Sequence, residues 1–354
     1  KFSGVWLMAY TTIDDPSVYF QTALYTGNAT QRNITNDGNS DLQPDWVWIK
    51  CRSAAEANML YDSTRGVTKD LRSDTTAAEN TNAQGLQAFN SDGFQLGTLQ
   101  NTNFNTKTMV AWQWKANGGT TTTNDASATG IGNTDSVYQA NTEAGFSIVT
   151  FSGTGSGMTV AHGLGGTPTL IISKARNDTE NWAVHTTLID GSLDYLRLSE
   201  TDAAGNSSFS LPTSTVFGYN GSNNYIAYCF RSIQGYSKIG TYIGNGDGNN
   251  TAADGTFVYT GFKPAWVMVK SSTVTQGWNI FDNKRTPTNE MGAFLFADTA
   301  DAETTGYDAM DFLSNGFKLR KNLNGANDSG QTYVYMAFAE NPFVSSKGVP
   351  TTAR

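Results

Sequence analysis

The sequence predicts an all-β fold made of tandem, related β-sandwich units. A segment consisting of a proline, an apolar run and a closing lysine occurs three times, at residues 43–50, 167–174 and 263–270. The copies lie roughly 100 residues apart, which exceeds the repeat length of solenoids and propellers and suits sandwich modules. The 36 glycines, with abundant Thr, Asn, Ser and Asp, indicate many turns between short strands. Helical periodicity is nearly absent, so we expect few helices.

Two further segments repeat in the same order within each unit. They occupy residues 91–97, 214–220 and 314–320, and residues 109–115, 225–231 and 333–339. This alignment makes Trp46, Leu170 and Trp266 equivalent positions. Both alternating faces of the last segment are apolar, which is typical of a strand buried on both sides. Pro44 and Pro264 fit the first position of a strand, because proline cannot donate to a ladder.

The repeats predict the domain boundaries. We expect an arm at 1–20, sandwich units at 21–117, 145–234 and 235–343, a linker at 118–144 and a tail at 344–354. The linker begins with a stretch rich in Gly, Thr, Ser and Asn, a composition typical of flexible segments. The arm matches no other part of the chain. Its apolar residues predict an interface with another subunit or virion protein; they are Val5, Trp6, Leu7 and Met8.

Composition excludes several classes of function. The net charge of −8, without any basic cluster, argues against nucleic-acid binding. No apolar run is long enough to cross a membrane, so no membrane insertion is expected. Cys51 and Cys229 lie in different units and predict two reduced, buried thiols.

Catalysis has little support in the sequence. The chain has two histidines and none of the common nucleophile, metalloprotease, redox or phosphate-binding motifs, so we expect no enzyme. One charged pair recurs three residues apart, as Asp62 with Arg65 and Asp282 with Arg285, and unit two lacks it. We interpret it as an ion pair or cap that fixes a loop; the alternative is an arginine that faces a ligand.

One loop could hold a divalent cation. Asp247, Asn249 and Asp254 place oxygen ligands close together, as Ca²⁺ requires, but the glutamate that closes an EF-hand is missing. An Asn/Gly hairpin turn is therefore the preferred interpretation, and no cofactor is expected, with Ca²⁺ as the alternative.

The aromatic residues suggest a possible sugar-binding surface. Sugars stack on aromatic rings while Asn and Asp bind their hydroxyl groups. Most of the tryptophans lie in apolar strands and are expected in the core. Trp182, preceded by Asn181, and the equivalent Trp278 are the better candidates for exposed stacking faces.

The ordered repeats resemble a family of unassigned function in tailed-phage and prophage proteins, often from cyanophages and other marine phages. The resemblance covers residues 22–343, and its main segments are residues 25–28, 43–50, 60–79, 145–174 and 255–270. It implies a virion surface component with concanavalin-like or jelly-roll sandwiches. It brings no catalytic residues.

The resemblance implies a non-enzymatic virion structural protein, assembled in the host cytoplasm and exposed on the particle. Two roles remain open. The first, narrowly preferred, is a tail fibre or adhesin that binds host surface polysaccharide. The second is a capsid decoration protein that stabilises the shell. Expected partners are other virion proteins and further copies of the chain in a homo-oligomer, with a trimer preferred.

Overall fold

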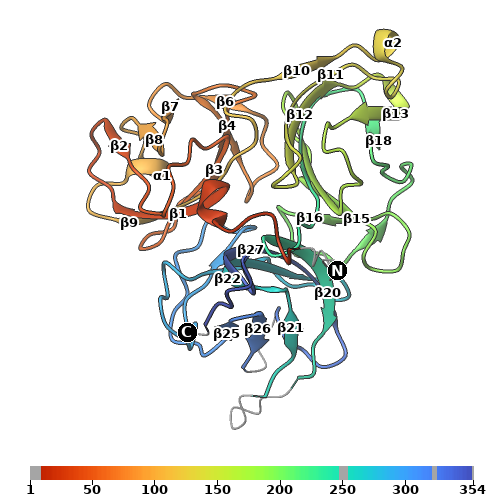
Figure 1. Ribbon diagram of the computed structural model, residues 1–354. Helices are drawn as coiled ribbons and strands as arrows, with labels where there is room; N and C mark the ends of the chain where they lie inside the picture. The colour runs from red at the N-terminus through yellow and green to blue at the C-terminus, as the bar shows by residue number, and fades with distance from the viewer. Residues whose placement is uncertain (1–8, 247–253, 321–324, 353–354) are drawn as a thin grey trace, which may run out of the picture.

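The computed structural model describes residues 9–246, 254–320 and 325–352. Strands make up 43% of the chain and helices about 3%, in several antiparallel sheets, so the predicted all-β fold is confirmed. Three β-rich lobes surround a common centre (Figure 1). We name them unit one (β1–β9), unit two (β10–β19) and unit three (β20–β27). The only helices among the described residues are η1 (Pro16–Val18), α1 (Gln100–Asn103) and α2 (Ala126–Thr129).

Unit one contains a six-stranded sheet and a three-stranded sheet. The order of the larger sheet is β1 (Phe20–Thr26), β9 (Thr108–Trp114), β3 (Trp46–Cys51), β4 (Met59–Asp62), β5 (Lys69–Arg72) and β6 (Asn80–Thr81). The order of the smaller sheet is β2 (Arg32–Ile34), β8 (Phe94–Leu96) and β7 (Leu86–Phe89). Apolar side chains between the two sheets form the core of this sandwich.

Unit two has an eight-stranded sheet and a two-stranded sheet. The larger order is β10 (Thr122–Asn124), β11 (Ser136–Asn141), β12 (Phe146–Ser152), β19 (Asn224–Phe230), β14 (Leu170–Ala175), β15 (Ala183–Thr186), β16 (Asp194–Arg197) and β17 (Gly205–Asn206). The smaller sheet pairs β13 (Gly155–Ala161) with β18 (Val216–Gly221).

The predicted linker at 118–144 is wrong, because β10 and β11 belong to this sheet and α2 lies between them. The segment rich in Gly and Thr was predicted to be flexible, but it contains two short strands. Of these, β11 pairs with β12 along its whole length.

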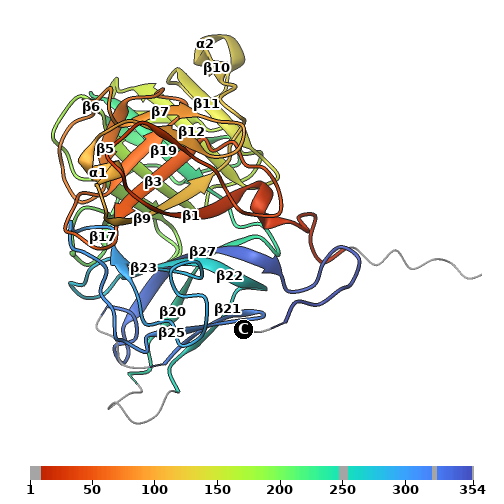
Figure 2. The same cartoon turned by 90° about the vertical axis from the view of Figure 1, so that its left-hand side faces the viewer.

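Unit three has a five-stranded and a three-stranded sheet. The larger order is β20 (Ser237–Ile243), β27 (Thr332–Pro342), β22 (Phe262–Ser271), β23 (Asn279–Asp282) and β24 (Leu295–Phe296). The smaller order is β21 (Phe257–Tyr259), β26 (Gly316–Leu319) and β25 (Met310–Leu313). Figure 2 shows unit three below unit one, with the first described residues of the chain running between them.

The three large sheets share one strand order and one register. Each contains the same run of five strands, namely β1-β9-β3-β4-β5, β12-β19-β14-β15-β16 and β20-β27-β22-β23-β24. Trp46 lies opposite Trp114 and Asp62; the matching sets are Leu170 with Phe230 and Thr186, and Trp266 with Phe338 and Asp282. The repeats seen in the sequence therefore occupy equivalent places in the sheets.

The large sheets bury both of their faces. In β3, Val47 and Ile49 point into the sandwich of unit one, while Trp46 and Trp48 point the other way, as the period of two requires. The second face contributes to a central core shared by all three units, whose members include Trp46, Trp112, Trp114, Ile172, Tyr228, Phe230, Trp266, Met336 and Phe338. The strands buried on both sides are thus confirmed, and the units are held together by apolar packing.

Aromatic rings make the central core continuous from unit to unit. Trp46 of unit one stacks on Tyr228 of unit two, with ring centroids 4.4 Å apart. Trp114 of unit one meets Trp266 of unit three edge to face at 5.5 Å. Aromatic contacts of this kind stabilise the folded state beyond the effect of burying apolar surface. The centre of the molecule therefore resembles the interior of one domain.

The two ends of the described chain pack on unit three and on each other. Tyr10 donates a hydrogen bond to the Gly261 carbonyl at 2.7 Å, and Ile13 enters the central core. Asp14 accepts hydrogen bonds from the backbone and side chain of Ser346. Within the predicted tail, residues 344–352 form a short hairpin-like turn. The predicted interface residues Val5, Trp6, Leu7 and Met8 lie outside the described residues.

Candidate functional site

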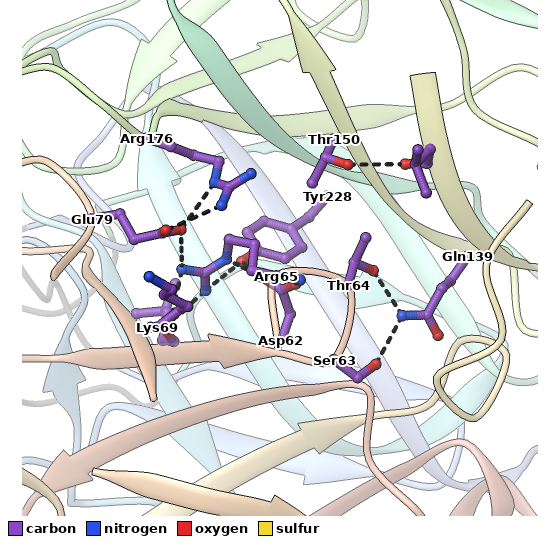
Figure 3. Close-up of polar contacts among 12 residues, drawn as sticks. Asp62, Ser63, Thr64, Arg65, Lys69, Glu79, Gln139, Thr150, Arg176 and Tyr228 are labelled. Carbon is purple, nitrogen blue, oxygen red and sulfur yellow. Dashed lines mark hydrogen bonds and ion pairs between the residues drawn. The ribbon is translucent and has the colours of Figure 1, made fainter. Parts of the chain in front are cut away.

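The recurring charged pair lies at a contact between units one and two. Asp62 ends β4, and its carboxylate accepts hydrogen bonds from the Arg65 backbone and guanidinium, which closes the loop. Arg65 also reaches Glu79 at 3.2 Å. Tyr228 of unit two donates its hydroxyl proton to Asp62 at 2.7 Å (Figure 3). The predicted loop-fixing ion pair is confirmed, and it also joins two units.

Charges in this cluster stabilise one another. Burial alone would lower the pKa of Arg65, but Asp62, Tyr228 and Glu79 outweigh burial and raise it. Burial would likewise raise the pKa of Glu79, yet hydrogen bonds and charge from Arg176 and Arg65 hold it below its ordinary value. Arg176 belongs to unit two and lies 2.9 Å from Glu79. Ion pairs and a tyrosine hydrogen bond therefore link units one and two at this junction.

Units three and one meet through an equivalent network. Asp282 pairs with Arg285 at the end of β23, and Trp112 of unit one donates its indole N–H to Asp282 at 3.0 Å. The guanidinium of Arg285 also lies over the Trp112 ring, 5.7 Å from its centroid. Glu303 accepts from Arg285 at 2.8 Å, as Glu79 does from Arg65.

The junction of units two and three has uncharged groups in place of these charges. Thr186 stands at the position of the aspartate and Ile189 at that of the arginine. The position of Tyr228 and Trp112 is taken by Met336, which like Ile189 packs in the central core. A buried charge needs a partner, so the absence of charge on one side of this junction is matched by its absence on the other side.

Two of the three lysines that close the repeated strands also join units, whereas Lys174 donates to the Ala175 and Asp178 carbonyls of its own unit. Lys50 of unit one donates to the Thr299 carbonyl of unit three at 3.4 Å, and Lys270 of unit three donates to the Asp202 carbonyl of unit two at 2.9 Å. Burial lowers the pKa of both amines to about 8. The sequence showed the lysine repeat but gave no sign that its amine binds backbone carbonyls.

The predicted sugar-stacking tryptophans are buried, so this prediction is wrong. Trp182 and Trp278 are 0% and 1% exposed. Trp182 donates its indole N–H to the Arg72 carbonyl of unit one at 2.8 Å, and Trp278 donates to the Arg197 carbonyl of unit two at 2.8 Å. Asn181 is half-buried. Each tryptophan ring lies against a neighbouring unit, although the loop before it is partly exposed.

The predicted cation loop is described only in part. Asp247 and Asn249 lie outside the described residues. Asp254 is exposed, and its carboxylate accepts a hydrogen bond from Lys318 at 2.7 Å, so its charge is already paired. Within the described ranges, no group of three or more His, Cys, Asp and Glu residues could hold a metal ion.

Both histidines and both cysteines are buried. Burial lowers the pKa of His162 and His185 to about 4, so both are neutral at pH 7. His185 is surrounded by the rings of Tyr195, Phe209 and Tyr219. The two cysteines are free thiols, as predicted.

Acid should therefore destabilise the protein between pH 6.5 and pH 4. Between these pH values the histidines are protonated in the unfolded state but stay neutral in the folded state. Their contribution to the free energy of unfolding is therefore fully present above pH 6.5 and is lost as the pH falls toward 4. The loss is at most roughly 3 kcal/mol per histidine. His185→Phe should reduce it, because phenylalanine suits the aromatic surroundings. Free energies of unfolding measured across this pH range test the prediction, and parallel curves for the two proteins would contradict it.

A hollow of about 500 Å³ lies where unit one meets unit three. Phe20, Gln21 and Thr22 of β1 line it on one side, and Asn283 and Lys284, in the loop after β23, line it on the other. The sequence analysis named none of these residues. They carry no motif, and the chain brings them together from segments more than two hundred residues apart.

Comparisons with known proteins identify one family. A family model described as "Domain of unknown function (DUF7483)" matches residues 15–342. The searches of curated proteins and of solved structures gave no significant match. No helix in the described part of the chain is both long and apolar enough to cross a bilayer. The family match spans all three units, so it covers the whole arrangement around the central core.

Proposed function

The chain belongs to the DUF7483 family, and we propose that it is a non-enzymatic structural protein exposed on the virion of a tailed phage. The observation that carries the proposal is the arrangement of three related sandwiches around one core within a single chain (Figure 1). Such a body has the approximate threefold order that symmetric assemblies usually obtain from three separate copies. The repeats resemble those of virion surface proteins, and this resemblance points to the virion as the symmetric assembly that the protein joins.

Of the two roles, we propose decoration of the capsid. A body with approximate threefold order can lie over a point where three shell subunits meet and contact each of them through one unit. The adhesin role has less support, because Trp182 and Trp278 cannot present their faces to a polysaccharide. The absence of catalysis belongs to the same proposal: the two histidines are buried, and the two recurring Asp–Arg pairs are engaged in contacts between units.

Particle imaging and particle melting test the role. We expect density for the protein at threefold positions of the shell and a lower rupture temperature for particles that lack it. A ligand that binds only the assembled shell stabilises that shell by mass action. Restoring the purified protein to stripped particles is the control and should restore the rupture temperature. Density at the tail, with an unchanged rupture temperature, would favour the adhesin role, and absence from particles would reject the virion assignment.

A further inference from the structure

The three junctions between units are filled in different ways. Where unit two meets unit one, β11 covers the outer edge of β12, and the Gln139 amide donates to Ser63 at 2.8 Å and Thr64 at 2.7 Å (Figure 3). Where unit three meets unit two, Leu188 and Ile189 pack against the central core. Where unit one meets unit three, the hollow remains. A strand of the same chain therefore fills the first junction and apolar side chains pack at the second, whereas a hollow lies at the third.

The hollow runs along the outer edge of β1, which is the counterpart of β12. Phe20 lies opposite Trp114 in the same way that Phe146 lies opposite Phe230. Among the described strands, only β9 pairs with β1, whereas β12 has β19 on one side and β11 on the other. An uncovered edge of this kind offers backbone donors and acceptors to an added strand.

The opposite side of the hollow carries the counterparts of the residues that bind Gln139. Because Asp62 and Asp282 are equivalent in register, Asn283 corresponds to Ser63 and Lys284 corresponds to Thr64. Lys284 forms an ion pair with Asp37 at 2.8 Å, and both side chains are well exposed. Exposed pairs of this kind contribute little to stability, so an incoming chain can displace this one easily.

An unpaired hydroxyl marks the position of the incoming side chain. Thr22 is 5% exposed, and its Oγ1 has no hydrogen-bond partner in the described part of the chain. Thr22 corresponds to Ile148, which lies opposite Gln139 in the completed junction. Leaving a buried polar group unpaired is costly, and a polar side chain placed opposite Thr22 would remove that cost.

We propose that the hollow receives an extended peptide segment of a partner protein, which adds a strand to the outer edge of β1 as β11 does to β12. The segment has strand-forming residues and carries an amide side chain opposite Thr22, within reach of Asn283 and Lys284. The hollow has the size of a typical binding pocket, roughly 300–1,000 Å³. The inference goes beyond the proposed function and does not depend on it, because it comes from comparing three junctions of one chain.

A peptide copied from the completed junction is the probe. A fluorescein-labelled peptide of residues 134–142, which contains β11, is titrated against the full chain by fluorescence anisotropy. We expect saturable binding that weakens about tenfold when Gln139→Ala is made in the peptide. Asn283→Ala in the protein should weaken binding similarly. Ser63→Ala, at the completed junction, is the matched control and should leave binding unchanged. A photoreactive group replacing the Tyr138 side chain should crosslink to β1.

Other occupants give different results. Absence of saturable binding, or crosslinks confined to β20, would overturn the proposal. Self-association of the chain that Asn283→Ala abolishes would identify a second copy as the occupant and overturn the assignment to a separate partner. Tighter peptide binding after deletion of residues 1–8 would show that these residues compete for the hollow, and it would also overturn the assignment to a separate partner. Circular dichroism and thermal midpoints establish that each variant is folded.

Discussion

Replacing Asp282 by alanine is expected to lower the free energy of unfolding by about 3–5 kcal/mol. The carboxylate is fully buried, neutralises the buried guanidinium of Arg285 and accepts the indole N–H of Trp112. Its removal leaves the buried guanidinium with Glu303 as its remaining carboxylate partner and the Trp112 indole N–H without its acceptor, which costs more than the pair itself contributes. Denaturant unfolding followed by tryptophan fluorescence measures the loss.

Unit two supplies the control for this prediction. The double variant Asp282→Thr, Arg285→Ile carries the residues found at the same positions of unit two, Thr186 and Ile189. It removes the charge together with its partner, so it should be less destabilised than Asp282→Ala alone. A single variant that loses less than about 1 kcal/mol, the range of exposed pairs, would show that the network contributes little to the junction.

Trp266→Ala and Trp278→Ala should both lower the free energy of unfolding by about 3–5 kcal/mol. Each ring is 1% exposed, Trp266 in the central core and Trp278 at the junction with unit two. The sequence favoured a much smaller effect for Trp278, so equal losses would establish its burial. Leu211→Ala is the control, because this side chain is 55% exposed and should change stability by less than about 0.5 kcal/mol. A Trp278 variant as stable as the control would contradict the described packing.

The sequence predicted the strands better than their surroundings. Period-two alternation and the threefold repeat predicted strands such as β3 and β27, and the equivalent positions within them, because these signals lie in neighbouring residues. Apolar residues on both faces of β3 showed that two layers cover it, but could not show that the second layer comes from other units. The spacing of Asp62 and Arg65 similarly predicted their pairing, whereas the contact with Tyr228 joins residues 166 positions apart.

The errors have a common physical cause. Trp182 follows a polar loop, and polar loops ordinarily face solvent, but the Trp182 ring at the end of this loop lies against a neighbouring unit. Gln139 lies in a segment that looked like a linker, because short strands at the edge of a sheet need few apolar residues of their own. The burial of Trp182 and the strand pairing of the segment around Gln139 both depend on long-range packing, which cannot be predicted from local composition.

The shared central core also decides when the protein can finish folding during synthesis. Phe338 and Met336 of β27, the last strand of unit three, cover rings contributed by β9, whose residues end at Trp114. At the usual rates of roughly 5–20 residues per second, the interval between these strands lasts about ten to forty-five seconds. Until β27 is made, the part of this tryptophan-rich face that unit three covers lacks its packing partners. Burial of the central core is complete only once β27 has emerged.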